Sequence, residues 1–349
     1  MLYIAVIEKG GYVSDVVVFI RSMRFFGGHV VTYPLLYALH KHLGGKRVRV
    51  IGRDPVDHNY VNLPWPVDFV QATGFWSHVA SLPRNARLMM ALHYSSDRYG
   101  LVAAVRRPAA RLGFSNRRIT DRVWTHACKK DYDEYLAVAN VRLLSQYLPV
   151  SIEANARECF ETIAAAAEHK PETTDIVLMP GGGAGAFKRW GLPNFLTLLA
   201  ALRRTLGARL TATFVLGPDE HAEYEALSAA GLPGVQLLMT RPLAEIAHVC
   251  IHARLIVAND CGPSHIAQSA CVPYVGIIHR ANPQWYWERP YSRCVTPPSL
   301  GADIQTITPD RVMDACLDVW PAPSGASSVM SHFRRAHRPE LHLPAQACS

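Results

Sequence analysis

Residues 259 to 265, with the sequence NDCGPSH, bring a carboxylate, a glycine, a hydroxyl and an imidazole together within one short stretch. The stretch follows the apolar run 255–258, a predicted buried strand, and leads into a predicted helix. A carboxylate there can accept hydrogen bonds from sugar hydroxyls, while backbone N–H groups and an imidazole can bind a diphosphate. Helix capping by the aspartate is the alternative interpretation. The candidate ligand-binding residues are Asp260, Gly262, Ser264 and His265.

Two other loops carry groups suited to the same kind of ligand. Gly181, Gly182 and Gly183 follow the apolar run 176–179, and glycines between a strand and a helix let backbone N–H groups approach a phosphate. Lys188 adds positive charge. Because the full phosphate-binding fingerprints are absent, a plain tight turn is equally compatible with this segment. Glu220 follows another apolar run and suits a ribose diol, although it could equally be a solvated turn residue.

Strand-length apolar runs alternate with helix-length segments along most of the chain. This alternation predicts an α/β protein with parallel sheets, whose ligands bind at the carboxyl ends of the strands. With 349 residues, two domains are expected. We predict two Rossmann-like domains, 1–150 and 151–320, facing each other across a cleft, and a mobile tail at 321–349. The predicted strands are 16–20, 48–51, 67–70, 88–92, a strand entered at 112–114, 176–179, 210–216, 255–258 and 272–278.

Charge is distributed unevenly between the two predicted domains. The formal net charge is +8; residues 1–150 hold 20 Lys and Arg against 10 Asp and Glu, whereas the remainder is slightly acidic. A basic first domain suits an acidic partner, and a generic solvated surface is the alternative. No nucleic-acid-binding motif accompanies the charge, so nucleic acid is not expected as a partner. The chain lacks an export signal and a membrane-length apolar run, so we expect a cytoplasmic protein with free thiols.

Several segments together resemble one known family. The runs PGGGAGAFKRWGLPNF, LGPDE and RPLAEIAHVCIHARLIVANDCGPSHIAQSACVPYVGI are similar to glycosyltransferase family 9, the ADP-heptose:lipopolysaccharide heptosyltransferases. In the first half, GGHVVTYPLLYALHKHLGGKRVRVIGR, ARLGFSNRR and DYDEYLAVANVRLL agree with the same family. The similarity covers about residues 16–320. The resemblance implies a GT-B fold, with an acceptor-binding first domain and a donor-binding second domain.

The resemblance also implies site roles and substrates. Lys188 would contact the diphosphate, Glu220 the adenosine ribose and Asp260 the sugar, while Gly262, Pro263, Ser264 and His265 would surround the phosphates. The donor would be ADP-heptose, the transfer inverting, and no cofactor or metal would be required. The acceptor would be an acidic glycan such as the lipopolysaccharide inner core, or another lipid-linked acceptor, and peripheral contact with the inner membrane is compatible with this role. The candidate acceptor-binding residues are Arg21, Arg24, His93, Arg117 and Arg118.

One departure from the family concerns the catalytic base. The family places an aspartate directly after the glycine of the first-domain loop, where this chain has His29. Histidine can act as a base near neutral pH, so His29 is the first candidate. Asp15, in the similar-looking stretch GGYVSDVV, is the second candidate under a different register. The alternative functions are a transferase that uses another nucleotide sugar or a protein acceptor, and a non-catalytic nucleotide-sugar-binding relative.

Overall fold

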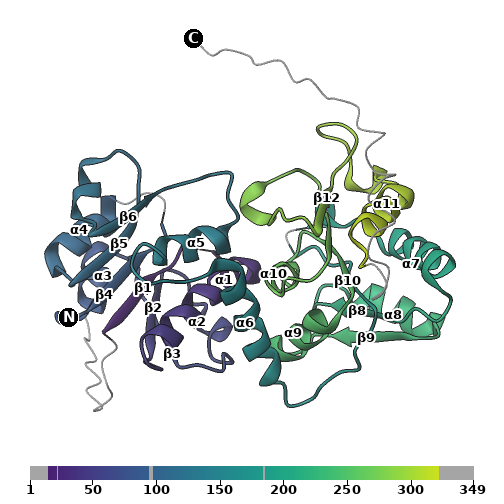
Figure 1. Cartoon of the computed structure of the whole chain (residues 1–349), viewed down its shortest axis with the longest axis horizontal. Coiled ribbons are helices and arrows are strands. Elements are labelled where there is room, and N and C mark those ends of the chain that lie inside the picture. Colours follow the sequence, from purple (N-terminus) through teal and green to yellow (C-terminus); the bar gives the residue numbers. More distant parts are fainter. Residues whose placement is uncertain (1–14, 22, 94–96, 184, 322–349) are drawn as a thin grey trace, which may run out of the picture.

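The chain folds into two α/β lobes that lie side by side (Figure 1). The computed structural model describes residues 15–21, 23–93, 97–183 and 185–321. Each lobe is built on a six-stranded sheet in which every described strand pairing is parallel. The predicted α/β class with two parallel sheets is confirmed. Almost all of the predicted tail, from 322 onward, lies outside the described residues.

The first sheet has the strand order β3-β2-β1-β4-β5-β6. Its central strand β1 pairs with β2 on one side and β4 on the other, so that Val18 lies opposite both Val50 and Met90. Because the chain moves outward from β1 in both directions, the boundary between β1 and β4 is a topological switch point. The strands are β1 (Val16–Phe19), β2 (Val48–Gly52), β3 (Val67–Gln71), β4 (Leu88–Ala91), β5 (Ala110–Ser115) and β6 (His126–Lys129).

The second sheet repeats this arrangement with the order β12-β11-β10-β7-β8-β9. Its switch point lies between β7 and β10, where Leu178 pairs with Val257. The loops after these two strands are the glycine-rich segment and the NDCGPSH segment. The fold therefore brings both candidate segments to the same edge of the sheet. The strands are β7 (Ile176–Met179), β8 (Ala212–Leu216), β9 (Val235–Met239), β10 (Leu255–Asn259), β11 (Tyr274–Ile277) and β12 (Ser292–Val295).

Helices cover both faces of each sheet. In β1, Val16 and Val18 belong to the core under α2 and α5, whereas Val17 and Phe19 belong to the core under α3 and α4. This alternation follows from the two-residue period of a strand. The helices are α1 (Phe26–Val30), α2 (Tyr33–His42), α3 (Phe75–Ser81), α4 (Asp97–Arg106), α5 (Leu136–Leu144), α6 (Ile152–Ala165), α7 (Leu192–Leu206), α8 (His221–Ala230), α9 (Leu243–His252), α10 (Ser264–Ser269) and α11 (Pro309–Val319).

Helix α6 joins the two lobes. It packs against α2 of the first lobe and α9 of the second. Its buried residues Cys159, Phe160 and Ile163 belong to a core cluster that continues into both sheets. Burial of this apolar surface holds the lobes together. Because α6 contacts helices of both lobes, the domain boundary near residue 150 stays a proposal.

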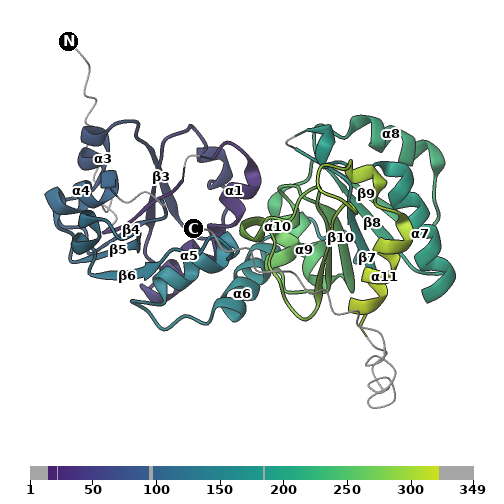
Figure 2. The ribbon, with the colours of Figure 1, turned by 90° about the horizontal axis from the view of Figure 1, so that it is seen from above.

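The lobes also meet through two short helices at the carboxyl edges of the sheets. Helix α1 of the first lobe contacts α10 of the second, and Figure 2 shows α10 on the side of its lobe that faces the first lobe. No helix among the described residues combines the length and apolarity needed to cross a membrane.

Candidate functional site

A cavity of about 610 Å³ lies between the lobes, at the carboxyl ends of the strands. This is the location at which open α/β sheets bind their ligands. The second lobe contributes the loops after β7, β8, β9 and β10, and the first lobe contributes α1 and the loop after β2. Of the sequence-predicted donor-binding residues, the cavity is lined by Gly182, Gly183, Lys188, Glu220, Asp260, Gly262, Pro263 and His265.

Lys188 and Asp260 connect the two loops at the switch point of the second sheet. The Nζ of Lys188 lies 2.5 Å from Oδ2 of Asp260, and both side chains are largely buried, with 20% and 14% of their areas exposed. Lys188 ends the short 3₁₀ helix η3 (Ala186–Lys188), whereas Asp260 directly follows β10. The pair therefore places one cation and one carboxylate, at hydrogen-bonding distance, on the wall of the cavity.

Glu220 is buried behind the glycine loop. Its Oε2 accepts a hydrogen bond from the Gly217 backbone N–H at 2.8 Å, and its Oε1 lies 3.0 Å from Nη2 of Arg189. A Cβ added at Gly181 would lie 3.0 Å from this carboxylate, so the close approach of the loop requires a small residue. Arg189 also lies 3.4 Å from Glu223. Arg189 therefore balances the charge of two carboxylates, a role that its position beside Lys188 in the sequence did not reveal.

Ser264 differs from the sequence expectation. It is 1% exposed and does not line the cavity; its hydroxyl donates to the Cys261 carbonyl at 2.7 Å. Its backbone N–H also donates to Cys261, at 3.2 Å, and the N–H of His265 donates to the Gly262 carbonyl at 3.2 Å. The first turn of α10 thus uses these N–H groups internally. The predicted role of Ser264 as a phosphate donor is a wrong prediction, since neither of its donors faces the cavity.

His265 lines the cavity as a neutral imidazole. It is 2% exposed, and burial lowers its pKa to about 4. Its Nδ1 lies 3.1 Å from the Tyr135 hydroxyl, and its ring centroid lies 5.3 Å from that of Trp285. A Cβ added at Gly27 would lie 2.6 Å from Cδ2 of His265. The ring therefore lies at the contact between α1 and α10.

His29 does not reach the cavity. It lies in α1, is 1% exposed and does not line the cavity. Its Nδ1 lies 2.8 Å from the Tyr60 hydroxyl and its Nε2 lies 2.9 Å from the Met23 carbonyl. Burial also lowers its pKa. Because both ring nitrogens have partners inside the first lobe, the geometry contradicts the prediction that His29 is the catalytic base.

Asp15 lies at the wrong end of the sheet for a catalytic base. It immediately precedes β1, so it stands at the amino edge, whereas the cavity lies at the carboxyl edge. Its carboxylate forms an ion pair with Lys46, with Oδ2 3.0 Å from Nζ. The structure contradicts the alternative register, and neither predicted base lines the cavity.

The five predicted acceptor-binding residues follow strands β1, β4 and β5, at the carboxyl edge of the first sheet, but none lines the cavity. Arg21 donates from Nε to the Leu92 carbonyl at 3.0 Å, and burial lowers its pKa to about 9. His93 lies 2.7 Å from the Ile20 carbonyl, and Arg118 forms an ion pair with Asp97. Arg24 and Arg117 are exposed. The fold therefore gathers these residues at one edge beside the cavity, without directing them into it.

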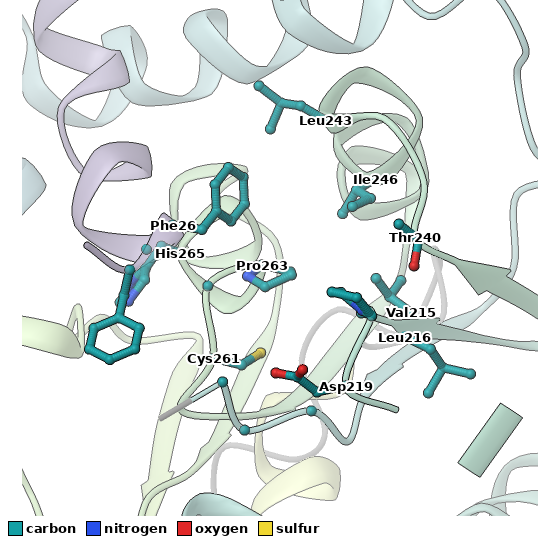
Figure 3. Close-up of a pocket in the computed structure, with 18 of the residues that line it drawn as sticks. Phe26, Val215, Leu216, Asp219, Thr240, Leu243, Ile246, Cys261, Pro263 and His265 are labelled. Atoms are coloured by element: carbon teal, nitrogen blue, oxygen red, sulfur yellow. The ribbon is translucent and has the colours of Figure 1, made fainter. Parts of the chain in front are cut away.

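The sequence interpretation missed an apolar part of the cavity. Figure 3 shows Leu243 and Ile246 on α9 facing the same space as Val215 and Thr240, which lie at the ends of β8 and β9. Aliphatic side chains that line a pocket in this way can pack against an apolar part of a ligand, such as a nucleobase. The sequence offered only a weak indication of these residues. Strand β9 was not predicted, so the residues at its carboxyl end could not be placed at the cavity. The first lobe adds residues that were also missed: Phe25, Phe26, Tyr33, His58, Asn59 and Asn62.

Comparisons with known proteins agree with this arrangement. Residues 86–304 match the family model described as glycosyltransferase family 9 (heptosyltransferase). No curated protein matches the whole chain or part of it.

Solved structures share the fold at low identity. An E. coli heptosyltransferase WaaC with ADP has a TM-score of 0.60 at 15% identity, covering 86% of this chain and 97% of that one. The E. coli ADP-heptose lps heptosyltransferase II has a TM-score of 0.55 at 15% identity, covering 87% and 98%. A UDP-GlcNAc 2-epimerase from Methanocaldococcus jannaschii has a TM-score of 0.50 at 12% identity, covering 86% and 91%. Since the fold also serves an epimerase, the reaction must be argued from the family match and the site.

Proposed function

Because the chain belongs to glycosyltransferase family 9 and has the GT-B fold, we propose that it transfers a heptosyl unit from ADP-heptose to an acidic glycan acceptor such as the lipopolysaccharide inner core. The observation that carries this proposal is the position of the Lys188–Asp260 pair. It lies on the cavity wall beside the glycine loop, at the switch point of the second sheet. A cation and a carboxylate beside the backbone of a glycine loop suit a sugar diphosphate.

The residues that line the cavity suggest an order in which the parts of the donor would bind. The adenine ring would lie between Leu243, Ile246 and the end of β8, where the walls are apolar. The ribose diol would face Glu220, and the diphosphate would lie over Gly182 and Lys188. The E. coli WaaC structure was obtained with ADP, which supports an adenine nucleotide as the donor's carrier.

The transfer would be a direct displacement with inversion at the anomeric carbon. As the bond from the sugar to the diphosphate breaks, negative charge grows on the leaving diphosphate. Lys188 and backbone N–H groups of the glycine loop can stabilise that charge without a metal ion. Asp260 would bind the sugar hydroxyls. Its ion pair with Lys188 would also fix the orientation of that lysine. The proposed reaction therefore requires no cofactor or metal.

The acceptor would approach from the first lobe. Residues 1–150 hold 20 Lys and Arg against 10 Asp and Glu, and this excess suits an acceptor that carries carboxylates or phosphates. Arg24 and Arg117 are exposed at the carboxyl edge of the first sheet, the edge at which the cavity lies. A lipid-linked acceptor would place this edge toward the cytoplasmic surface of the inner membrane, with peripheral contact.

A non-catalytic nucleotide-sugar-binding protein is the second candidate. The observation in its favour is that neither His29 nor Asp15 lines the cavity. A transferase that uses another nucleotide sugar or a protein acceptor would share the same diphosphate site.

One pair of measurements separates these functions. Thermal shift with ADP, UDP and GDP sugars should show stabilisation by ADP compounds alone, since binding to the native state raises its stability. A transfer assay with ADP-heptose and deacylated inner-core oligosaccharides should then show release of ADP that requires the acceptor. Donor binding without acceptor-dependent release would support the non-catalytic candidate. Stabilisation by UDP or GDP sugars only would exclude ADP-heptose.

A further inference from the structure

A displacement of this kind needs a group that takes the proton from the attacking hydroxyl. The residues proposed to hold the diphosphate belong to the second lobe, and an attacking hydroxyl must approach from the side opposite to the leaving diphosphate. The proton acceptor should therefore enter the cavity from the first lobe. The first lobe lines the cavity with Phe25, Phe26, Gly27, Gly28, Tyr33, His58, Asn59 and Asn62.

Among these first-lobe lining residues, only Tyr33 and His58 are titratable. Tyr33 is fully buried, its hydroxyl donates to the Asn59 carbonyl at 2.6 Å, and burial raises its pKa well above the ordinary value for tyrosine. The Tyr33 hydroxyl therefore keeps its proton and already donates it to the Asn59 carbonyl, so it cannot accept a proton from the substrate. His58 is exposed and lies on η1 (Asp57–Asn59), in the loop that follows β2.

The titratable groups of the second lobe, including the exposed Asp219, lie on the side that would hold the diphosphate. Four of them are poor alternatives for a further reason. Asp260 is paired with Lys188, and Glu220 is paired with Arg189. Burial raises the pKa of Cys261 to about 12, so this thiol stays protonated. His265 belongs to the contact between α1 and α10, and its burial disfavours the charged imidazole that a base must become.

The first lobe holds the loop that carries His58 at the two positions that follow this residue. Tyr33 binds the carbonyl of Asn59, and the hydroxyl of Tyr60 lies 2.8 Å from Nδ1 of His29. The side-chain nitrogen of Asn59 lies 3.2 Å from Nε2 of His58 and also donates to the Val56 carbonyl. These contacts restrain the loop, so His29 would act as a positioning residue for the loop that presents His58.

We propose that His58 is the general base that activates the acceptor hydroxyl. This inference rests on the proposed function. The acceptor hydroxyl replaces the Asn59 amide at Nε2 of His58, and its proton passes to that nitrogen while the oxygen forms a bond with the anomeric carbon. The bond between that carbon and the diphosphate oxygen breaks, and its electron pair leaves with ADP. The imidazolium then returns its proton to solvent, so the step needs no further reactant.

The test compares His58→Gln and His58→Gly with the wild type and with His42→Ala, which removes an exposed histidine of α2 outside the site. Turnover of ADP-heptose with the inner-core oligosaccharide and the dissociation constant of ADP are both measured. For His58→Gln we expect kcat to fall about 100-fold or more, with ADP binding unchanged. Exogenous imidazole should restore part of the rate of His58→Gly, because it can enter the vacated space and accept the proton.

Each other outcome overturns a defined part of the inference. Full turnover by His58→Gln would exclude His58 as the base and leave the proposed function intact. A weaker ADP affinity that accounts for the whole loss would assign His58 to donor binding instead. Failure of imidazole to restore any rate would also count against a proton-transfer role. Absence of turnover by the wild type with ADP-heptose would overturn the proposed function, and the role of His58 with it.

Discussion

The ammonium group of Lys188 lies 2.5 Å from the carboxylate of Asp260, although 72 positions separate the two residues in the sequence. They are neighbours because β7 and β10 are adjacent strands, and each residue stands beyond the carboxyl end of its strand. The pair has the geometry of a charge-assisted hydrogen bond. The ion pair therefore fixes the orientation of the Lys188 side chain before a diphosphate binds.

Lys188→Ala should strongly reduce turnover, since it removes the cation placed to stabilise the leaving diphosphate. Loss of one preorganised donor of this kind lowers kcat by about 100-fold to 1,000-fold. The matched control is Lys46→Ala, which breaks an ion pair with Asp15 at the amino edge of the first sheet. Steady-state kinetics of ADP release measures both variants. An unchanged kcat in Lys188→Ala would mean that the diphosphate binds elsewhere.

Glu220→Gln should weaken both folding and donor binding. The carboxylate of Glu220 has 6% of its side-chain area exposed and lies 3.0 Å from the guanidinium of Arg189. Removing the Glu220 carboxylate leaves Arg189 with only the more distant Glu223 as counter-charge, at a cost of about 1 to 3 kcal/mol in the free energy of unfolding. The double variant Glu220→Gln with Arg189→Met should be more stable than the single variant. Urea unfolding measures stability; a double variant less stable than the single one would contradict this account.

The strands that sequence analysis missed all lie at sheet edges, although one edge strand, β3, was predicted. The missed strands are β6, β9 and β12, and each lies at an edge of its sheet. Edge strands are partly exposed; in β9 only Leu238 is buried. Their sequences therefore lack the continuous apolar run of a strand that is buried on both faces. Central strands such as β7 and β10 are fully buried and were predicted within one residue of their bounds.

The positions of the residues predicted to bind a donor could be foreseen because these residues lie in loops that follow buried strands. Lys188, Glu220 and Asp260 all line the cavity as expected. The orientation of His29 was not predictable in the same way, because the direction of a side chain within a short helix depends on tertiary packing. His29 directly follows the cavity-lining Gly28, yet its ring points to Tyr60. His58 lies in an irregular loop, where no periodic pattern indicates which side chain faces the cavity.

His29→Ala should lower both turnover and stability through the loop that carries His58. The change leaves the Tyr60 hydroxyl without the ring nitrogen that lies 2.8 Å from it, inside the buried core of the first lobe. A buried group that loses its partner costs about 1 to 3 kcal/mol. Because His29 does not touch the substrate, imidazole should not restore the lost rate. Rescue of His29→Ala by imidazole in the turnover assay would instead identify His29 as the base.

Stability should fall in mild acid because of His265. Burial lowers the pKa of this imidazole from 6.5 to about 4, so the unfolded chain binds a proton more readily than the native chain does. The stability that the buried, neutral imidazole contributes is fully present above pH 6.5 and is lost as the pH falls toward 4. At pH 5 the loss is about 2 kcal/mol relative to pH 7. Urea unfolding measures the free energy of unfolding at pH 5 and at pH 7. The difference between the two pH values should be smaller for His265→Gln than for the wild type. For His42→Gln, whose imidazole is exposed, it should equal that of the wild type.

Gly27→Ala should impair turnover by separating the two lobes. A Cβ at this position would lie 2.6 Å from Cδ2 of His265 and 3.3 Å from Cα of Gly262. Real Cβ atoms do not approach other heavy atoms this closely, and His265 is confined by Tyr135 and Trp285, so α1 must move away from α10. The cavity is built from both helices, and its geometry would change with their spacing.

The control for this variant is Gly74→Ala, at a first-lobe position where an added Cβ meets nothing within 4 Å. We expect kcat/KM of Gly27→Ala to fall at least about 10-fold, because misplacing a catalytic group by 1 Å can cost about 100-fold. Thermal unfolding should change less than turnover, since α6 still joins the cores of the two lobes. Small-angle scattering would detect a wider separation of the lobes. Wild-type kinetics in Gly27→Ala would show that the contact between α1 and α10 does not set the geometry of the site.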